Sequence, residues 1–242
     1  MTLIIACACK DGIVIGADSQ MTMGSSAGPI RKITLDKIIP VTNGILIAGA
    51  GDVSIIQKIK KKIDTIPKEL KDGEKIEQIK ELLCNSIVHS LRSEMLNKFR
   101  DLYGSNDAEE KTPSATLILA GYQNNRPIIY EISPDGIDVE IEDYCAIGIG
   151  VPFSQVILKD FNVCSLSIEE GKLLVYKVIS DAIETGAYGM GFPIKIWTIT
   201  NKGHLNSDQI EEKELKAIED TVKAIRELTK ETFLKRNNNS AQ

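Results

Sequence analysis

The chain opens with two short runs that show no alternation between hydrophobic and polar positions. Leu3–Cys9 and Ile13–Ala17 are apolar at almost every position, and Lys10-Asp11-Gly12 between them is typical of a turn. A half-exposed strand would alternate, so continuous apolar runs of this length favour strands that are buried on both faces. The pattern predicts a hairpin enclosed between two layers of the fold.

Further strands are predicted in both halves of the chain. Ser19–Lys32 is rich in serine, glycine and methionine, and it predicts a loop with short strand pieces. Two apolar runs separated by a turn then predict a second hairpin, Ile33–Val41 and Ile45–Ala48. The later apolar runs that predict strands are Ala115–Gly121, Pro127–Ile132, Gly136–Ile141, Cys145–Ile149 and Ile194–Thr200.

Apolar residues that recur every three or four positions predict four amphipathic helices. They cover residues 55–66, 76–99 and 168–185, and the last begins near Ser207. Ser167 and Glu170 have the spacing of a capping box, which marks the start of the third helix. Gly104–Pro113 is polar and predicts a mobile segment. The asparagine-rich residues 237–242 predict a disordered tail.

The order of these elements favours one α+β domain over residues 1–242. Groups of hairpins alternate with groups of helices, which indicates two antiparallel sheets stacked face to face with helices outside. A doubly wound parallel sheet would alternate single strands with single helices. The chain also lacks a phosphate-binding or dinucleotide-binding glycine motif.

The composition of the chain indicates the compartment of the protein and the classes of partner that it does not bind. The chain has 29 basic and 34 acidic residues, and this net charge of −5 argues against nucleic-acid binding. Its longest apolar runs are too short to cross a bilayer, so we expect no membrane association. An odd number of cysteines (five) and an N-terminus without a basic segment indicate a cytoplasmic protein without disulfide bonds. Cys7-x-Cys9 lacks a second ligand pair, so we expect no metal and no cofactor.

Thr2 is the first candidate for chemistry. Removal of the initiator methionine would give this threonine a free α-amine, which titrates near pH 7.7–8.0. Such an amine can act as the general base for its own hydroxyl, so a histidine is not needed. Many proteins begin with Met-Thr, however, and the dipeptide alone favours no function.

Three residues near the first two hairpins extend this candidate site. Asp18 ends a buried strand, and Lys37 has the same strand parity as Ile39 and Val41. A buried lysine requires an anionic partner, and Asp18 is the candidate. The alternative is that Asp18 caps a turn while Lys37 protects a sheet edge. Gly51 ends a strand, where its N–H suits an oxyanion, although a plain strand–helix turn is the alternative.

Thr2–Asp18 and Asp36–Asp52 together resemble the proteasome β-subunit family of N-terminal-nucleophile (Ntn) hydrolases. The resemblance extends over most of the chain and implies a four-layer αββα sandwich. It implies that Thr2 is the nucleophile, that Asp18 and Lys37 tune it, and that the Gly51 N–H holds the oxyanion. The chain carries about three extra residues within Ser19–Asp36, and a different alignment would make Lys32 the lysine.

The same resemblance implies a substrate and an assembly. The substrate would be a peptide or an unfolded protein, and the subunits would form a homo-oligomeric ring or associate with related subunits. The expected substrate-binding residues lie on both sides of the nucleophile: Ser19, Met21, Met23, Gly49 and Ala50. Met21 and Met23 predict an apolar contact.

Three positions depart from the family pattern. Ile149, Gly186 and Gly189 stand where active members carry serine, aspartate and serine, which position the threonine amine and its water. Three functions remain open: a threonine peptidase, a protein ligase of the connectase kind that uses the same acyl ester, and a non-catalytic ring subunit. Loss of the water-positioning groups favours transfer to an amine over transfer to water.

Overall fold

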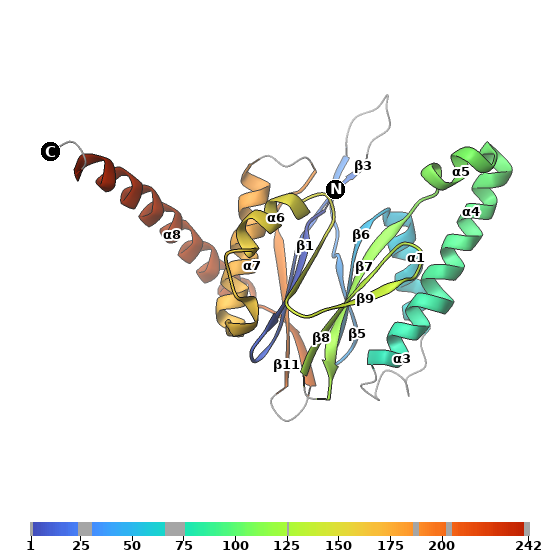
Figure 1. Cartoon of the computed structure of the whole chain (residues 1–242), viewed down its shortest axis with the longest axis horizontal. Helices are drawn as coiled ribbons and strands as arrows, with labels where there is room; N and C mark the ends of the chain where they lie inside the picture. Colours follow the sequence, from blue (N-terminus) through green and yellow to red (C-terminus); the bar gives the residue numbers. More distant parts are fainter. Residues whose placement is uncertain are drawn as a thin grey trace.

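The computed structural model describes residues 2–23, 31–65, 76–124, 126–185, 189–201 and 205–239. Two sheets lie against each other in the middle of the molecule, and helices cover both outer faces (Figure 1). Apolar residues from both sheets meet between them and include Ile4, Ile15, Leu46 and Ile118. The structure confirms the predicted α+β sandwich of two antiparallel sheets.

The predicted buried hairpin forms the centre of the first sheet. Its strands are buried at every position, as the continuous apolar runs indicated. The strand order is β10-β1-β2-β11-β12, and all neighbours are antiparallel. The strands are β1 (Ile4–Cys9), β2 (Gly12–Asp18), β10 (Tyr144–Ile147), β11 (Ile194–Asn201) and β12 (Leu205–Gln209).

The second sheet follows the chain order β5-β6-β7-β8-β9 and is also antiparallel. A separate two-stranded hairpin, β3–β4, leaves the sandwich directly after β2. The strands are β3 (Gln20–Met23), β4 (Arg31–Thr34), β5 (Ile38–Thr42), β6 (Ile45–Gly51), β7 (Ala115–Gln123), β8 (Arg126–Ile132) and β9 (Asp138–Ile141).

Each sheet carries its own helical layer. On the second sheet lie α1 (Val53–Ile63), α3 (Ile76–Glu81), the π-helix η1 (Leu82–His89), α4 (Ser90–Tyr103) and α5 (Ser105–Lys111). On the first sheet lie α6 (Val151–Leu158), the 3-10 turn η2 (Val163–Ser165), α7 (Ile168–Glu184) and the start of α8 (Glu212–Asn239). In the described part of the chain, all helices are too short or too polar to span a membrane.

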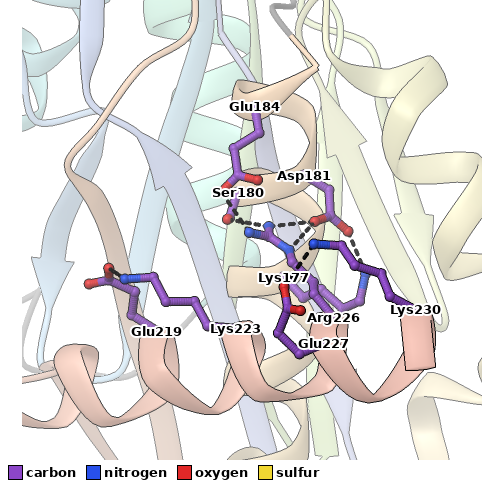
Figure 2. Close-up of polar contacts among 9 residues, drawn as sticks. All are labelled: Lys177, Ser180, Asp181, Glu184, Glu219, Lys223, Arg226, Glu227 and Lys230. Atoms are coloured by element: carbon purple, nitrogen blue, oxygen red, sulfur yellow. Dashed lines mark hydrogen bonds and ion pairs between the residues drawn. The ribbon is translucent and has the colours of Figure 1, made fainter. Parts of the chain in front are cut away.

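Helix α7 begins with a side-chain cap, and α8 is held against α7 by polar contacts. The capping box at Ser167 and Glu170 forms as predicted and begins α7. The following helix, α8, is held along α7 by polar contacts (Figure 2). Arg226 of α8 donates to Asp181 at 3.0 Å through Nε, to Ser180 at 2.7 Å and to Glu184 at 2.6 Å. Beyond this point α8 extends away from the sandwich (Figure 1).

Several predicted elements were wrong or incomplete. Gly104–Pro113 was expected to be a polar, mobile segment and no helix was predicted there, yet seven of its residues form α5. The strand β12 occupies 205–209, so α8 begins at Glu212 and not near Ser207. Helix α8 continues to Asn239, three residues into the segment expected to be disordered, and residues 240–242 lie outside the described chain. Helix α6 was not predicted, because its sequence is apolar without a helical period.

Candidate active site

Thr2 lies at the beginning of β1, and neighbouring backbone fixes its position. Its carbonyl accepts a hydrogen bond from the Gly150 N–H at 3.2 Å. The next N–H along the chain, that of Leu3, donates to Asp18 Oδ1 at 3.0 Å. Gly148 approaches so closely that a Cβ there would lie 2.3 Å from the Thr2 carbonyl oxygen. Thr2 is 8% exposed and therefore has little freedom to move.

Asp18 and Lys37 form the ion pair expected from the sequence. Lys37 Nζ lies 2.6 Å from Asp18 Oδ1, and both residues are buried. The second oxygen, Asp18 Oδ2, accepts from the N–H groups of Gln20 at 3.3 Å and Gly191 at 3.2 Å. Burial lowers the pKa of Lys37, and the Asp18 carboxylate opposes that change. This carboxylate thus connects the lysine to the backbone one residue after Thr2.

The direction of the Lys37 side chain differs from the parity argument. Val41 packs on the helical side of its sheet, whereas Lys37 reaches Asp18 in the other sheet. The reason is that Lys37 precedes β5 and lies in the short connection after β4, where strand alternation does not hold. Its carbonyl accepts from the Gly49 N–H at 3.2 Å, which keeps this connection beside β6.

Gly51 has the geometry expected of an oxyanion donor. Its φ of +129° is outside the range of ordinary L residues, and a Cβ would lie 2.5 Å from the Ser114 carbonyl oxygen. The Asp52 N–H donates to that same oxygen at 2.8 Å, so Gly51 and Ala115 are a non-hydrogen-bonded pair. The Gly51 N–H therefore points away from β7, in the same direction as the Gly49 N–H.

A pocket opens between the two sheets beside Thr2. Its lining residues are Thr2, Ala50, Gly51, Thr116, Gly148 and Ile149. The pocket brings together the predicted nucleophile, the predicted oxyanion glycine and one predicted substrate contact, Ala50. Ile149, which stands where the family pattern has serine, is 58% exposed at the rim.

Other predicted substrate contacts do not line this pocket. Gly49 faces the helical layer, since a Cβ there would lie 3.2 Å from Ile56. Met21 lies half-buried in β3, and Ser19 is buried, with no hydrogen-bond partner for its hydroxyl in the described chain. The side chains of Met23 and Lys32, and the whole of Gly186, lie outside the described residues.

Sequence reasoning missed three residues that the structure brings to the site. Gly191 donates to Asp18, Gly148 touches the Thr2 carbonyl, and Thr116 lines the pocket. Thr116 is found only through strand register, because it lies opposite Ala50 in the β6–β7 pair. A threonine in a strand sequence gives no such signal by itself.

Four of the five cysteines are buried, which disfavours their reactive thiolate form. All five are free, and burial raises the pKa of Cys9 to about 12. Burial also raises the pKa of Cys7 and Cys145 well above the ordinary thiol value. Among the described residues, no group of three or more histidines, cysteines and carboxylates is arranged to hold a metal ion.

Comparison with known proteins identifies similar chains. Residues 2–197 match the model of a family described as "Proteasome subunit". A proteasome subunit beta of Nanoarchaeum equitans is 30% identical over 204 residues, which cover 84% of this chain and 95% of that protein. Proteasome subunit beta 2 of Thermococcus onnurineus is 27% identical over 204 residues and is covered to 92%.

A solved structure shares the whole fold. An Anbu mutant from Hyphomicrobium sp. strain MC1 superposes with a TM-score of 0.72 and covers 97% of both chains. Its sequence is 15% identical to this chain, so this likeness concerns the fold alone.

Proposed function

Because the chain belongs to the proteasome subunit family, we propose that Thr2 is the nucleophile of a reaction that cleaves peptide bonds. The observation that carries the proposal is the pocket that Thr2 shares with Gly51, next to the Asp18–Lys37 pair. Removal of Met1 would free the Thr2 α-amine. The proposed enzyme is then a threonine-type hydrolase that acts through an acyl ester.

The first half of the reaction forms the acyl ester. The α-amine takes the proton of the Thr2 hydroxyl as Oγ1 attacks the substrate carbonyl. The Gly51 N–H stabilises the negative charge that develops on the carbonyl oxygen. The amine then returns the proton to the departing nitrogen of the substrate, so the peptide bond breaks and the acyl group remains on Thr2.

The Asp18–Lys37 pair supplies the positive charge for this step. The ammonium of Lys37 favours the alkoxide form of Thr2 and lowers the pKa of the α-amine, which keeps that amine available as a base. Asp18 holds the ammonium through one oxygen and uses the same oxygen to hold the Leu3 N–H. The charge is thereby fixed relative to the nucleophile before substrate binds.

The acceptor of the acyl group distinguishes two candidate activities. Transfer to water gives a peptidase, and transfer to an amine gives a ligase. The apolar, exposed Ile149 at the pocket rim favours the second, because it offers no hydrogen bond to a water molecule. A test with water alone and with an added amine acceptor separates these activities.

The substrate and the surroundings belong to the same proposal. We assign a peptide or an unfolded protein as substrate, and a ring of copies or of related subunits as the assembly. The five free cysteines support a reducing compartment such as the cytoplasm. The proposed chemistry needs no metal or cofactor, because the α-amine, the hydroxyl, the Gly51 N–H and the Lys37 ammonium provide the protons and charges that it uses.

The experiment is intact-mass measurement after incubation with a peptide epoxyketone. This reagent forms a ring with a free α-amine and its neighbouring hydroxyl, so it reports a reactive N-terminal threonine. We expect loss of Met1 and one adduct in the wild-type protein, no adduct in Thr2→Ala, and nearly none in Lys37→Ala.

The outcomes separate the alternatives. Protein that retains Met1 and takes up no reagent contradicts the proposal and supports a non-catalytic subunit. Protein that has lost Met1 but remains unmodified has an exposed threonine that does not react with that peptide. In that case peptide turnover is compared between wild type and Thr2→Ala, and equal turnover shows that Thr2 is not the nucleophile.

A further inference from the structure

Among the described residues that line the pocket, only Thr2 and Thr116 have polar side chains. The other lining residues are glycine, alanine and isoleucine, which offer no side-chain hydrogen bond. In the described part of the chain, the Thr116 hydroxyl has no hydrogen-bond partner. A half-buried hydroxyl that faces a pocket and has no protein partner is available to a bound molecule.

Strand register determines which way Thr116 faces. Its neighbours in β7, Ala115 and Leu117, pack against the helical layer, whereas Ile118 packs between the sheets. Side chains alternate along a strand, so Thr116 faces the space between the sheets. Ala50 lies opposite it in β6 and faces the same space.

The pocket therefore has two chemically different sides. The Gly51 N–H points away from β7, so a bound carbonyl oxygen lies on the β5 side of β6. Thr116 lies on the β7 side, together with Gly148 and Ile149 at the end of β10. With the oxygen on the β5 side, the group that departs from the carbonyl carbon, and the acceptor that later replaces it, would lie on the β7 side.

We propose that Thr116 binds the acceptor, water or an amine, that attacks the acyl ester on Thr2. This assignment rests on the proposed function and extends it. The hydroxyl both donates and accepts, so it can hold the acceptor with a lone pair directed at the ester carbon. The acceptor forms a bond to that carbon and passes its proton to the α-amine. The ester C–O bond then breaks, and the α-amine returns the proton to Oγ1.

The test separates the two half-reactions. An activated aryl ester of a peptide acylates Thr2 and releases a phenolate, which needs no acceptor, and the product burst measures this step. The later steady rate measures transfer of the acyl group to water. We expect Thr116→Val to leave the burst rate unchanged and to lower the steady rate by about 3- to 10-fold, as for loss of one hydrogen bond. Thr116→Ser should restore the steady rate.

Controls distinguish binding of the acceptor from a structural effect. Thr198→Val removes a buried strand hydroxyl in β11, outside the pocket, and should leave both rates unchanged. Thermal unfolding of each variant shows whether it is folded. If Thr116→Val does not fold, Thr116→Ala replaces it in both rate measurements. Equal steady rates in wild type and Thr116→Val overturn the assignment, and so does a parallel loss of both rates. If the wild-type protein gives neither a burst nor an epoxyketone adduct, both the proposed function and the Thr116 assignment are wrong.

Discussion

A single buried carboxylate organises the candidate site at the scale of residues. Asp18 accepts from three backbone N–H groups and from the Lys37 ammonium, and these donors come from separate parts of the chain. The carboxylate therefore fixes the lysine and the backbone next to Thr2 together. Burial lowers the pKa of Lys37, and the charge of Asp18 counteracts that effect.

The pH dependence of adduct formation tests this coupling. In the proposed mechanism the ammonium form of Lys37 is the active one, so reactivity should fall as the pH rises through the Lys37 pKa. Burial places that pKa below the ordinary value of 10.5. In Asp18→Asn the neighbouring charge that raises the Lys37 pKa is absent, so the alkaline limb, the fall in reactivity at high pH, should move to lower pH. The measurement is the rate of epoxyketone adduct formation between pH 7 and 11.

Lys37→Arg provides the control for this prediction. Its guanidinium does not titrate in this range, so any remaining reactivity should not fall at the pH where Lys37 loses its proton. An alkaline limb at the same pH in wild type and Asp18→Asn would contradict the coupling. Asp18→Asn should also lower the free energy of unfolding by about 3–5 kcal/mol, since it leaves a buried charge without its partner.

At the scale of elements, close contact between β2 and α7 holds Asp18 in place. A Cβ at Gly16 would lie 2.3 Å from Val175 Cγ1 and 3.0 Å from Ile179 Cδ1. Gly171 of α7 similarly allows Cys9 to approach. The helix can therefore lie directly on the two central strands, and Asp18 follows Gly16 by two residues.

Gly16→Ala should destabilise the protein by about 1–3 kcal/mol, because the added methyl group overlaps Val175. Val175→Ala removes the overlapping atoms, so the double variant should recover part of that loss. Urea unfolding of the wild type, both single variants and the double variant measures the coupling. Additive losses in the double variant would show that the two residues do not clash.

The same elements show what the sequence predicts well. Leu3–Cys9 and Ile13–Ala17 were predicted because strands that are buried on both faces have apolar residues at consecutive positions. The α7 start was predicted from the local chemistry of Ser167 and Glu170. Thr116 and Gly191 were missed because their roles arise from register and from contacts between distant segments. Helix α5 was missed because its polar residues give no apolar period.

At the scale of the whole molecule, α8 is packed on the sandwich at its start and exposed toward its end. The family match ends at residue 197, before β12 and α8 begin. Lys172 of α7 pairs with Glu214 near the start of α8, and Arg226 pairs with Asp181 and Glu184 further along. After Arg226 the helix exposes Leu228, Phe233 and Leu234. Among the ion pairs between described residues of α7 and α8, those of Arg226 lie nearest to the exposed part of the helix (Figure 2).

Arg226→Met should release the distal part of α8 without unfolding the sandwich. Hydrogen exchange of the amides in residues 222–234 measures the release, and we expect faster exchange there with unchanged exchange in β1 and β2. Lys223→Met is the matched control, because its ion pair with Glu219 lies within α8. Equal exchange in the two variants would show that Arg226 does not clamp the helix.

The position of Thr2 has a practical consequence for anyone who labels this protein. Its carbonyl accepts a hydrogen bond from Gly150, and Thr2 itself lines the pocket, so the amine that the proposed mechanism needs lies beside the pocket. Under the proposed mechanism an affinity tag at this end would block the α-amine, and assays on tagged material would then report an inert protein. The distal part of α8 extends away from the sandwich and from β1, so a purification handle or a fluorophore belongs at that end (Figure 1).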